Sequence, residues 1–294
     1  MNGIDELIDL EEADLLDSDF FDFEDVDTED LYADEEDLEL DLEDDLEYEV
    51  DYFEPDLEDL YEADVAYESE PEVIGPDTRK LIRDTTKTPF RFICHMSDGC
   101  TGTLVKPNKV LTVAHCIYNR GTKKATWKGD WVTPGRNDKG NAKRNQPYGR
   151  AKVVRADFPA AYRTARTYND AWPHDYAVLT LDRALRVPGG SWSRLRVIAP
   201  KTLLKVKVNT AGYPGTAQRQ YWTYNRIINI SGARMRHVLD TKPGQSGSPI
   251  WLKWKNTRSI VGLHKAGFTG SPQQNRGVIY TPGNLANINR WIAS

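Results

Sequence analysis

Residues 73–294 of this 294-residue chain contain no glutamate, and residues 1–72 contain no lysine or arginine. The first segment holds 35 of the 45 acidic residues, including all 17 glutamates, whereas the second holds all 38 basic residues and ten aspartates. A charge block as dense as the first cannot bury enough apolar surface to offset chain entropy. We therefore expect residues 1–72 to be largely disordered when alone, with the basic remainder of the chain as a natural partner.

Further absences narrow the class of protein. No stretch is long and apolar enough to span a membrane, so we expect no membrane partner. The start, "NGIDELIDLEE", has neither the basic nor the apolar region of a secretory signal. The three cysteines leave at least one unpaired within the chain. The five histidines show no metal-ligand spacing, and acids after residue 72 are too sparse for a calcium cage, so no metal or organic cofactor is expected.

After residue 73, short apolar runs alternate with Gly, Pro and Asn, which is typical of an all-β barrel or sandwich. The expected strands are 109–114, 176–181, 205–213, 226–230, 248–254, 259–264 and 277–281. A helix is expected at the C-terminus, because Leu285, Ile288 and Ile292 share one face after Thr281-Pro282.

Three short segments carry residues suited to nucleophilic catalysis. They are "TVAHC" with His115, "HDYAVLTL" with Asp175, and "PGQSGSPIW" with Ser246. A serine hydroxyl is a weak nucleophile until an imidazole removes its proton, and a buried carboxylate orients that imidazole. Glycines near the serine let the amides of Gly244 and Ser246 point at a developing oxyanion. Each segment alone is a weak signal, but the order His, Asp, Ser, each beside a strand, predicts a catalytic triad.

With these segments the chain resembles the chymotrypsin-like proteases, over residues 73–294 and not before. The resemblance implies two six-stranded antiparallel β-barrels, at about 85–195 and 196–280, a C-terminal helix at about 282–293, and an acidic prosegment at 1–72. It also implies a Cys100–Cys116 disulfide, a secreted zymogen that acts as a monomer, and protein or peptide substrates cleaved through an acyl-enzyme.

The chain is also similar to the bacterial glutamyl endopeptidases, which cut after glutamate. The matching segments are "VIGPDTR", "CTGTLV", "AHCIYN", "VTPGRN", "GYPG", "DTKPGQSGSPIW", "GLHKAG" and "NRG". This resemblance implies that His264 contacts the substrate carboxylate, with Thr241 and Gln245 in the same pocket. It also implies activation between Glu72 and Val73, after which the Val73 amine helps to bind the substrate.

The missing glutamate supports this specificity independently. At ordinary usage, residues 73–294 would contain roughly 14 glutamates. An enzyme that cuts after Glu gains by lacking its own target, and the segment to be removed ends on Glu72. Self-activation is the corresponding hypothesis.

Two alternatives remain open. Asp240 lies six residues before Ser246, the spacing of the pocket carboxylate in trypsin, which would favour cleavage after Lys or Arg. Against this, His264 would crowd the pocket, and 38 basic residues would invite self-digestion. The second alternative is a polyanion-binding protein on a protease scaffold, since basic runs such as 139–155 would attract nucleic acid or acidic polysaccharide. Cys94 is expected to be a buried small side chain, and His95, His174 and His237 ordinary surface or strand residues.

Overall fold

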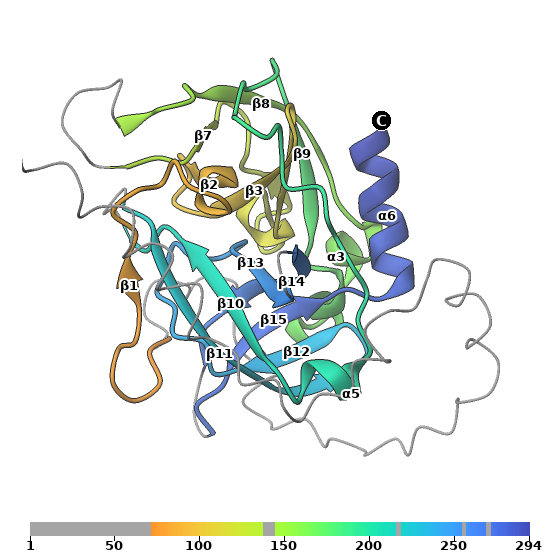
Figure 1. The fold of residues 1–294 in the computed structure, drawn as a ribbon. Helices are drawn as coiled ribbons and strands as arrows, with labels where there is room; N and C mark the ends of the chain where they lie inside the picture. Colours follow the sequence, from red (N-terminus) through yellow and green to blue (C-terminus); the bar gives the residue numbers. More distant parts are fainter. Residues whose placement is uncertain (1–71, 138–144, 216–218, 255–256, 269–271) are drawn as a thin grey trace, which may run out of the picture. The chain divides into compact units, whose positions relative to one another are not determined.

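The computed structural model describes residues 72–137, 145–215, 219–254, 257–268 and 272–294 (Figure 1). The segment predicted to be disordered therefore lies, apart from Glu72, outside the described residues. Strands form most of the regular structure. In the ranges just given, no helix is long and apolar enough to cross a membrane.

The first half of the described chain forms a closed antiparallel barrel, with the strand order β2, β3, β4, β9, β8, β7. Its interior is filled by apolar side chains such as Leu104, Val110 and Leu179, all fully buried. The strands are β2 (Ile93–Met96), β3 (Thr101–Lys106), β4 (Lys109–Thr112), β7 (Trp131–Pro134), β8 (Ala151–Asp157) and β9 (Ala177–Leu181), with a separate ribbon of β5 (Tyr118–Asn119) and β6 (Lys124–Ala125).

The second half forms another six-stranded antiparallel barrel, in the order β11, β10, β13, β14, β15, β12, which closes because β11 also pairs with β12. A short strand near the start of the described chain, β1 (Lys80–Leu81), pairs with β11. The barrel strands are β10 (Lys207–Gly212), β11 (Tyr221–Ser231), β12 (Arg234–His237), β13 (Pro249–Trp254), β14 (Thr257–Ala266) and β15 (Asn275–Ile279).

The predicted C-terminal helix is confirmed as α6 (Pro282–Ala293), which packs against β9 (Figure 1). A capping box between Thr281 and Asn284 satisfies the first helical amides, and Ile288 is fully buried. The remaining helical elements are short: η3 (Phe90–Phe92), η4 (Ala114–Cys116), α3 (Ala160–Thr164), α4 (Tyr168–Ala171), η5 (Trp172–His174) and α5 (Pro200–Leu203).

Two six-stranded barrels and a C-terminal helix confirm the predicted fold class, with a local correction at His115. The expected strand 109–114 ends at Thr112, and His115 lies in the turn η4 instead. The chain leaves the sheet there because the His115 amide donates to Asp175 rather than to a neighbouring strand.

Thr101 joins the two barrels beside the predicted nucleophile. Its amide donates to the Ser246 carbonyl at 2.9 Å, and its hydroxyl donates to the Gly244 carbonyl at 2.9 Å. The same hydroxyl accepts the Tyr213 amide at 3.0 Å. A residue of β3 thereby anchors the glycine-rich turn of the second barrel against the first.

Candidate active site

His115 and Asp175 meet at one end of a strand pair. Thr112 of β4 pairs with Ala177 of β9, so the residues just beyond these strand ends are neighbours. His115 Nδ1 lies 2.8 Å from Asp175 Oδ2, and the His115 amide donates to Asp175 Oδ1 at 2.9 Å. The Asp175 side chain is fully buried.

The environment keeps Asp175 ionised. Burial raises the pKa of its carboxyl, but the charges of His115 and Lys265 and the hydrogen bonds from His115 lower it, and the net pKa is well below the usual range. A carboxylate at this place accepts the Nδ1 proton of the neutral imidazole. The second ring nitrogen, Nε2, is then unprotonated and can accept a proton from a nucleophile.

Ser246 lies in a turn that only glycine allows on either side. Gly244 and Gly247 have φ values of +99° and +87°, and a Cβ on Gly247 would collide with the Thr101 carbonyl oxygen. The Ser246 hydroxyl donates to the carbonyl of Lys265 at 3.0 Å. Among the described residues, neither the Gly244 amide nor the Ser246 amide donates to a backbone carbonyl, so both can serve a ligand oxygen.

A disulfide braces this region, as the resemblance implies. Cys100 and Cys116 are bonded, with their Cα atoms 6.2 Å apart, and the Cys116 sulfur lies 3.9 Å from the Ser246 carbonyl oxygen. The bond thus ties the residue after His115 to the start of β3, close to the turn that carries Ser246.

Lys265 contributes a buried positive charge to the same cluster. Its Nζ lies 3.2 Å from Asp175 Oδ2 and 3.8 Å from the centre of the Tyr168 ring, and the residue is only 1% exposed. Its carbonyl holds the Ser246 hydroxyl, so backbone and side chain touch two predicted triad residues.

His264, the residue before Lys265, is fully buried and paired with a second histidine. The Leu239 amide donates to His237 Nδ1 at 3.3 Å, so the proton of the His237 ring is on Nε2. That nitrogen lies 3.2 Å from His264 Nδ1, which therefore accepts. The chain of hydrogen bonds leaves the remaining proton of His264 on Nε2, at the far side of its ring. Burial and the neighbouring His264 lower the pKa of His237, so this ring stays neutral.

The nitrogen Nε2 of His264 faces the carboxylate of Glu72. Oε2 of Glu72 lies 3.6 Å from it, the two side chains are 5% and 0% exposed, and neither atom has another hydrogen-bond partner in the described part of the chain. The Glu72 carbonyl accepts from Asn275 Nδ2 at 2.7 Å and from the Thr241 amide at 3.1 Å. A buried glutamate side chain is thus held against His264, Thr241 and Asn275.

Asp240 is also buried but is occupied by the backbone that follows Val73. Its Oδ1 accepts the Ile74 amide at 2.8 Å, and its Oδ2 accepts the Thr78 amide and hydroxyl at 2.9 and 2.6 Å. These three bonds hold the segment 74–78 in place. The carboxylate that might have bound a Lys or Arg substrate is used inside the fold.

The remaining predicted pocket residues lie nearby but differ in orientation. Gln245 is buried, and its Oε1 accepts from the Lys242 amide at 3.1 Å and from Arg79 at 3.4 Å. Val73 is half-buried, with its nitrogen in the peptide bond to Glu72. Thr241 therefore contacts the glutamate, whereas the amide oxygen of Gln245 is bound by Lys242 and Arg79.

Comparison with known proteins agrees with this geometry. A family model described as a trypsin-like peptidase domain matches residues 100–263. The glutamyl endopeptidase of Bacillus licheniformis is 31% identical over 231 residues, which cover 74% of this chain and 68% of that protein. The chain belongs to the trypsin-like serine peptidases.

Two further relatives fit this family. Human serine protease 23 is 28% identical over 233 residues, covering 69% of this chain and 59% of that protein. A solved structure of a Glu endopeptidase in complex with MPD aligns with a TM-score of 0.65 at 28% identity, over 76% of this chain and all of that one.

Three features of this trypsin-like peptidase were not singled out from its sequence: Lys265, Asn275 and the partner role of His237. His237 is a strand residue as expected, but its ring is fully buried against His264. The only available signal was adjacency, since Lys265 follows His264 and Asn275 begins the segment "NRG". Their roles depend on how β12, β14 and β15 align.

The other candidates lie away from the peptidase site. Cys94 is a buried free thiol, as expected, and burial raises its pKa far above the usual range. Burial and, to a lesser extent, Arg136 lower the pKa of His95 to about 4. Across the described ranges, no three His, Cys, Asp or Glu side chains gather as metal ligands would.

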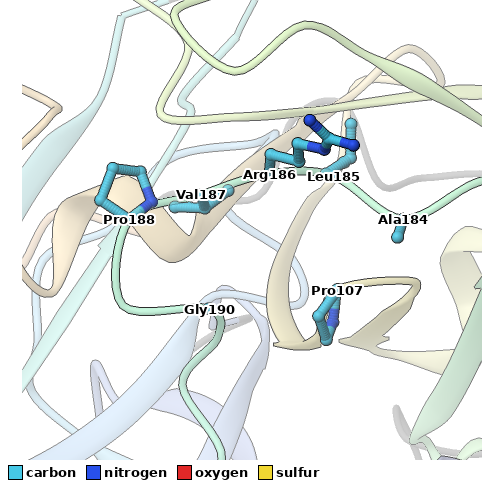
Figure 2. A pocket seen from close by; sticks show the side chains of 7 residues that line it. All are labelled: Pro107, Ala184, Leu185, Arg186, Val187, Pro188 and Gly190. Carbon is cyan, nitrogen blue, oxygen red and sulfur yellow. The ribbon is translucent and has the colours of Figure 1, made fainter.

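An apolar surface pocket forms between the β3–β4 turn and the segment after β9. Figure 2 shows its lining by Pro107, Ala184, Leu185, Arg186, Val187, Pro188 and Gly190. It shares no residue with the predicted triad or with the surroundings of Glu72, so it has no part in the chemistry of the candidate active site.

Proposed function

We propose that this trypsin-like peptidase is the precursor of a secreted, glutamate-specific endopeptidase. The observation that carries the proposal is the Glu72 carboxylate, which is buried against His264 Nε2. A pocket that already holds a glutamate side chain next to a buried imidazole donor suits a glutamate at the residue before the cut bond. The B. licheniformis relative, named a glutamyl endopeptidase, and the lack of glutamate after residue 72 point the same way.

In the proposed mechanism, His115 Nε2 removes the hydroxyl proton of Ser246 while Oγ attacks the substrate carbonyl. To do so, Oγ first gives up its hydrogen bond to the Lys265 carbonyl. Asp175 orients the imidazole and stabilises it once charged, and the amides of Gly244 and Ser246 bind the oxyanion. The imidazolium then protonates the leaving amine, and water, activated by the same histidine, hydrolyses the acyl-enzyme.

Specificity would come from a donor fixed in direction by the histidine pair. Because His237 Nε2–H donates to His264 Nδ1, the proton of the neutral His264 ring is held on Nε2. A carboxylate entering the pocket meets an N–H that need not reorient, and a buried carboxylate without such a donor would be costly. Thr241 and Asn275 line the same space through their contacts with Glu72.

Glu72 also accounts for latency in the uncleaved chain. Its side chain fills the space next to His264, so a substrate glutamate cannot enter until Glu72 leaves. The carbonyl of the Glu72–Val73 bond is held by Asn275 and Thr241 rather than by the amides of Gly244 and Ser246. We therefore propose that one molecule activates another, after which the Val73 amine replaces Glu72 near the pocket.

The acidic segment is the second proposed partner. With 35 acids and no Lys or Arg in residues 1–72, it complements the 38 basic and ten acidic residues that follow. We propose that this attraction masks the basic surface until cleavage. The same surface would give the mature domain a nonspecific affinity for polyanions.

The trypsin-like alternative is weakened by Asp240. A substrate Lys or Arg needs an unoccupied carboxylate, and both oxygens of Asp240 are bound by Ile74 and Thr78. Releasing them would detach the segment that follows the activation bond. Cleavage after Lys or Arg is therefore not the function that this arrangement favours.

The proposal is tested with the full-length chain and its Ser246→Ala variant. We expect the wild type to accumulate a product that begins at Val73 and hydrolyses a Glu-containing peptide, while Ser246→Ala stays intact and inactive. Adding processed wild type should cleave the Ser246→Ala chain at the same bond. Equal and negligible hydrolysis by both proteins would overturn the enzyme assignment.

A further inference from the structure

A lysine ammonium buried beside the triad carboxylate is a feature that peptide hydrolysis does not require. Lys265 is 1% exposed, and an ammonium removed from water is costly unless opposite charge and hydrogen bonds compensate for it. The compensation here comes from Asp175 Oδ2 at 3.2 Å and from the face of the Tyr168 ring at 3.8 Å. The fold therefore keeps a positive charge at this place.

The fold holds Lys265 from two sides. It lies near the end of β14, where the amide of His264 donates to the Ser248 carbonyl at 2.9 Å. Tyr168 begins the helix α4, which starts with a capping box between Thr167 and Asp170. Because both ends of the contact belong to regular structure, the ammonium cannot readily turn away from Asp175.

We propose that Lys265 is a positioning residue that extends peptidase activity to lower pH, by holding Asp175 ionised and opposing proton uptake by the Asp175–His115 pair. The inference rests on the proposed catalytic roles of these residues. It adds a second charge to the site, whose effect can be measured apart from substrate specificity.

The sign follows from the charges around the pair. A proton taken up on His115 turns an ion pair of Lys265 and Asp175 with a neutral ring into a cluster with one net positive charge. Nζ lies 3.2 Å from Asp175 Oδ2, which lies 2.8 Å from His115 Nδ1, so the ammonium is at most about 6 Å from the ring nitrogen. At that distance and an effective dielectric constant of about 20, the repulsion shifts proton uptake by up to about two pH units. Activity should persist to correspondingly lower pH.

Other ionisable groups surround the pair but stay in place when Lys265 is changed. Arg276 stacks on the same Tyr168 ring, 4.9 Å from its centre, and its Nε donates to the Gly267 carbonyl. The ionisable groups on the elements packed around the pair are Tyr168 and Asp170 of α4, His174 of η5, Arg276 of β15, Arg234 of β12 and Arg120 after β5. A comparison of variants at position 265 alone therefore isolates the ammonium.

The test compares Lys265→Met, which removes the charge, with Lys265→Arg, which keeps it. Each full-length chain is processed, and kcat/KM for a Glu-containing peptide is followed from about pH 4.5 to 9. We expect the acid limb of Lys265→Met to move up by about one to two pH units, and that of Lys265→Arg to stay near the wild type. A Lys265→Met limb that coincides with the wild type, whatever its height, would overturn the proposal.

Two additions keep the test decisive. Lys265→Gln removes the charge but keeps an N–H donor for Asp175, and it replaces Lys265→Met if that variant does not fold. The ring protons of His115, followed by NMR in the Ser246→Ala chain, report the same midpoint without catalysis. If the wild type hydrolyses nothing, the proposed function fails, while an unmoved His115 titration rejects the role of Lys265 alone.

Discussion

Replacing the histidine pair by leucine tests the specificity pocket. In a chain carrying His264→Leu and His237→Leu together, no imidazole is left without its partner, and the pocket loses its N–H donor. The donor that it loses faces a carboxylate at 3.6 Å between side chains that are 0% and 5% exposed, so solvent cannot substitute for it. A hydrogen bond to a charged group contributes about 1.5–3 kcal/mol. We expect kcat/KM for a Glu peptide to fall about 10- to 150-fold.

The assay uses matched peptides that differ only in the residue before the cut, either Glu or Gln. Gln has the same shape but no charge, so its kcat/KM should change by less than about threefold on losing the histidine pair. His237→Leu alone, which leaves Nε2 of His264 in the pocket but no longer fixes its proton, should give an intermediate loss for Glu. Equal losses for the Glu and Gln peptides would refute the reasoning, because they would mean that His264 supports the fold rather than the charge.

Other predictions follow from single contacts. Glu72→Gln in the full-length chain should slow release of the Val73 N-terminus at least tenfold, as N-terminal sequencing over time would show; release at the wild-type rate would implicate a different activating enzyme. Gly247→Ala should lower the unfolding free energy by at least about 2 kcal/mol, measured by urea unfolding of the Ser246→Ala chain, because it combines a positive φ with a collision against Thr101. The low pKa of His95, about 4, means that the folded state favours its neutral ring; the associated stability is present above about pH 6.5 and is lost as pH falls towards 4, by up to about 3 kcal/mol. The variant His95→Gln should show a smaller acid-induced loss in the same unfolding measurement, and an identical loss would contradict this assignment.

The sequence alone supported the fold and the members of the triad, because both depend on local patterns. Short apolar runs with turn residues between them led to two β-barrels, and the residues around His115, Asp175 and Ser246 are contiguous motifs. Even so, the strand expected to reach His115 ends at Thr112. The chain turns there to form a hydrogen bond with a residue 60 positions away, and no local pattern reports such a contact.

The polar interior of the pocket was harder to predict. Asp240 has the spacing of a pocket carboxylate, yet it binds the Ile74 and Thr78 amides, and no sequence pattern distinguishes those uses. His237 and His264 come together only because β12 and β14 both flank β15. Such pairings depend on strand register and side-chain direction across the barrel, which one sequence does not contain.

The central claim is that this peptidase cuts after glutamate. The most direct test is to map the bonds cut in a denatured protein by the processed chain, with processed Ser246→Ala protein as the blank. We predict that new ends follow Glu predominantly, with fewer after Asp and none after Lys or Arg. A map dominated by cuts after Lys or Arg would contradict the account.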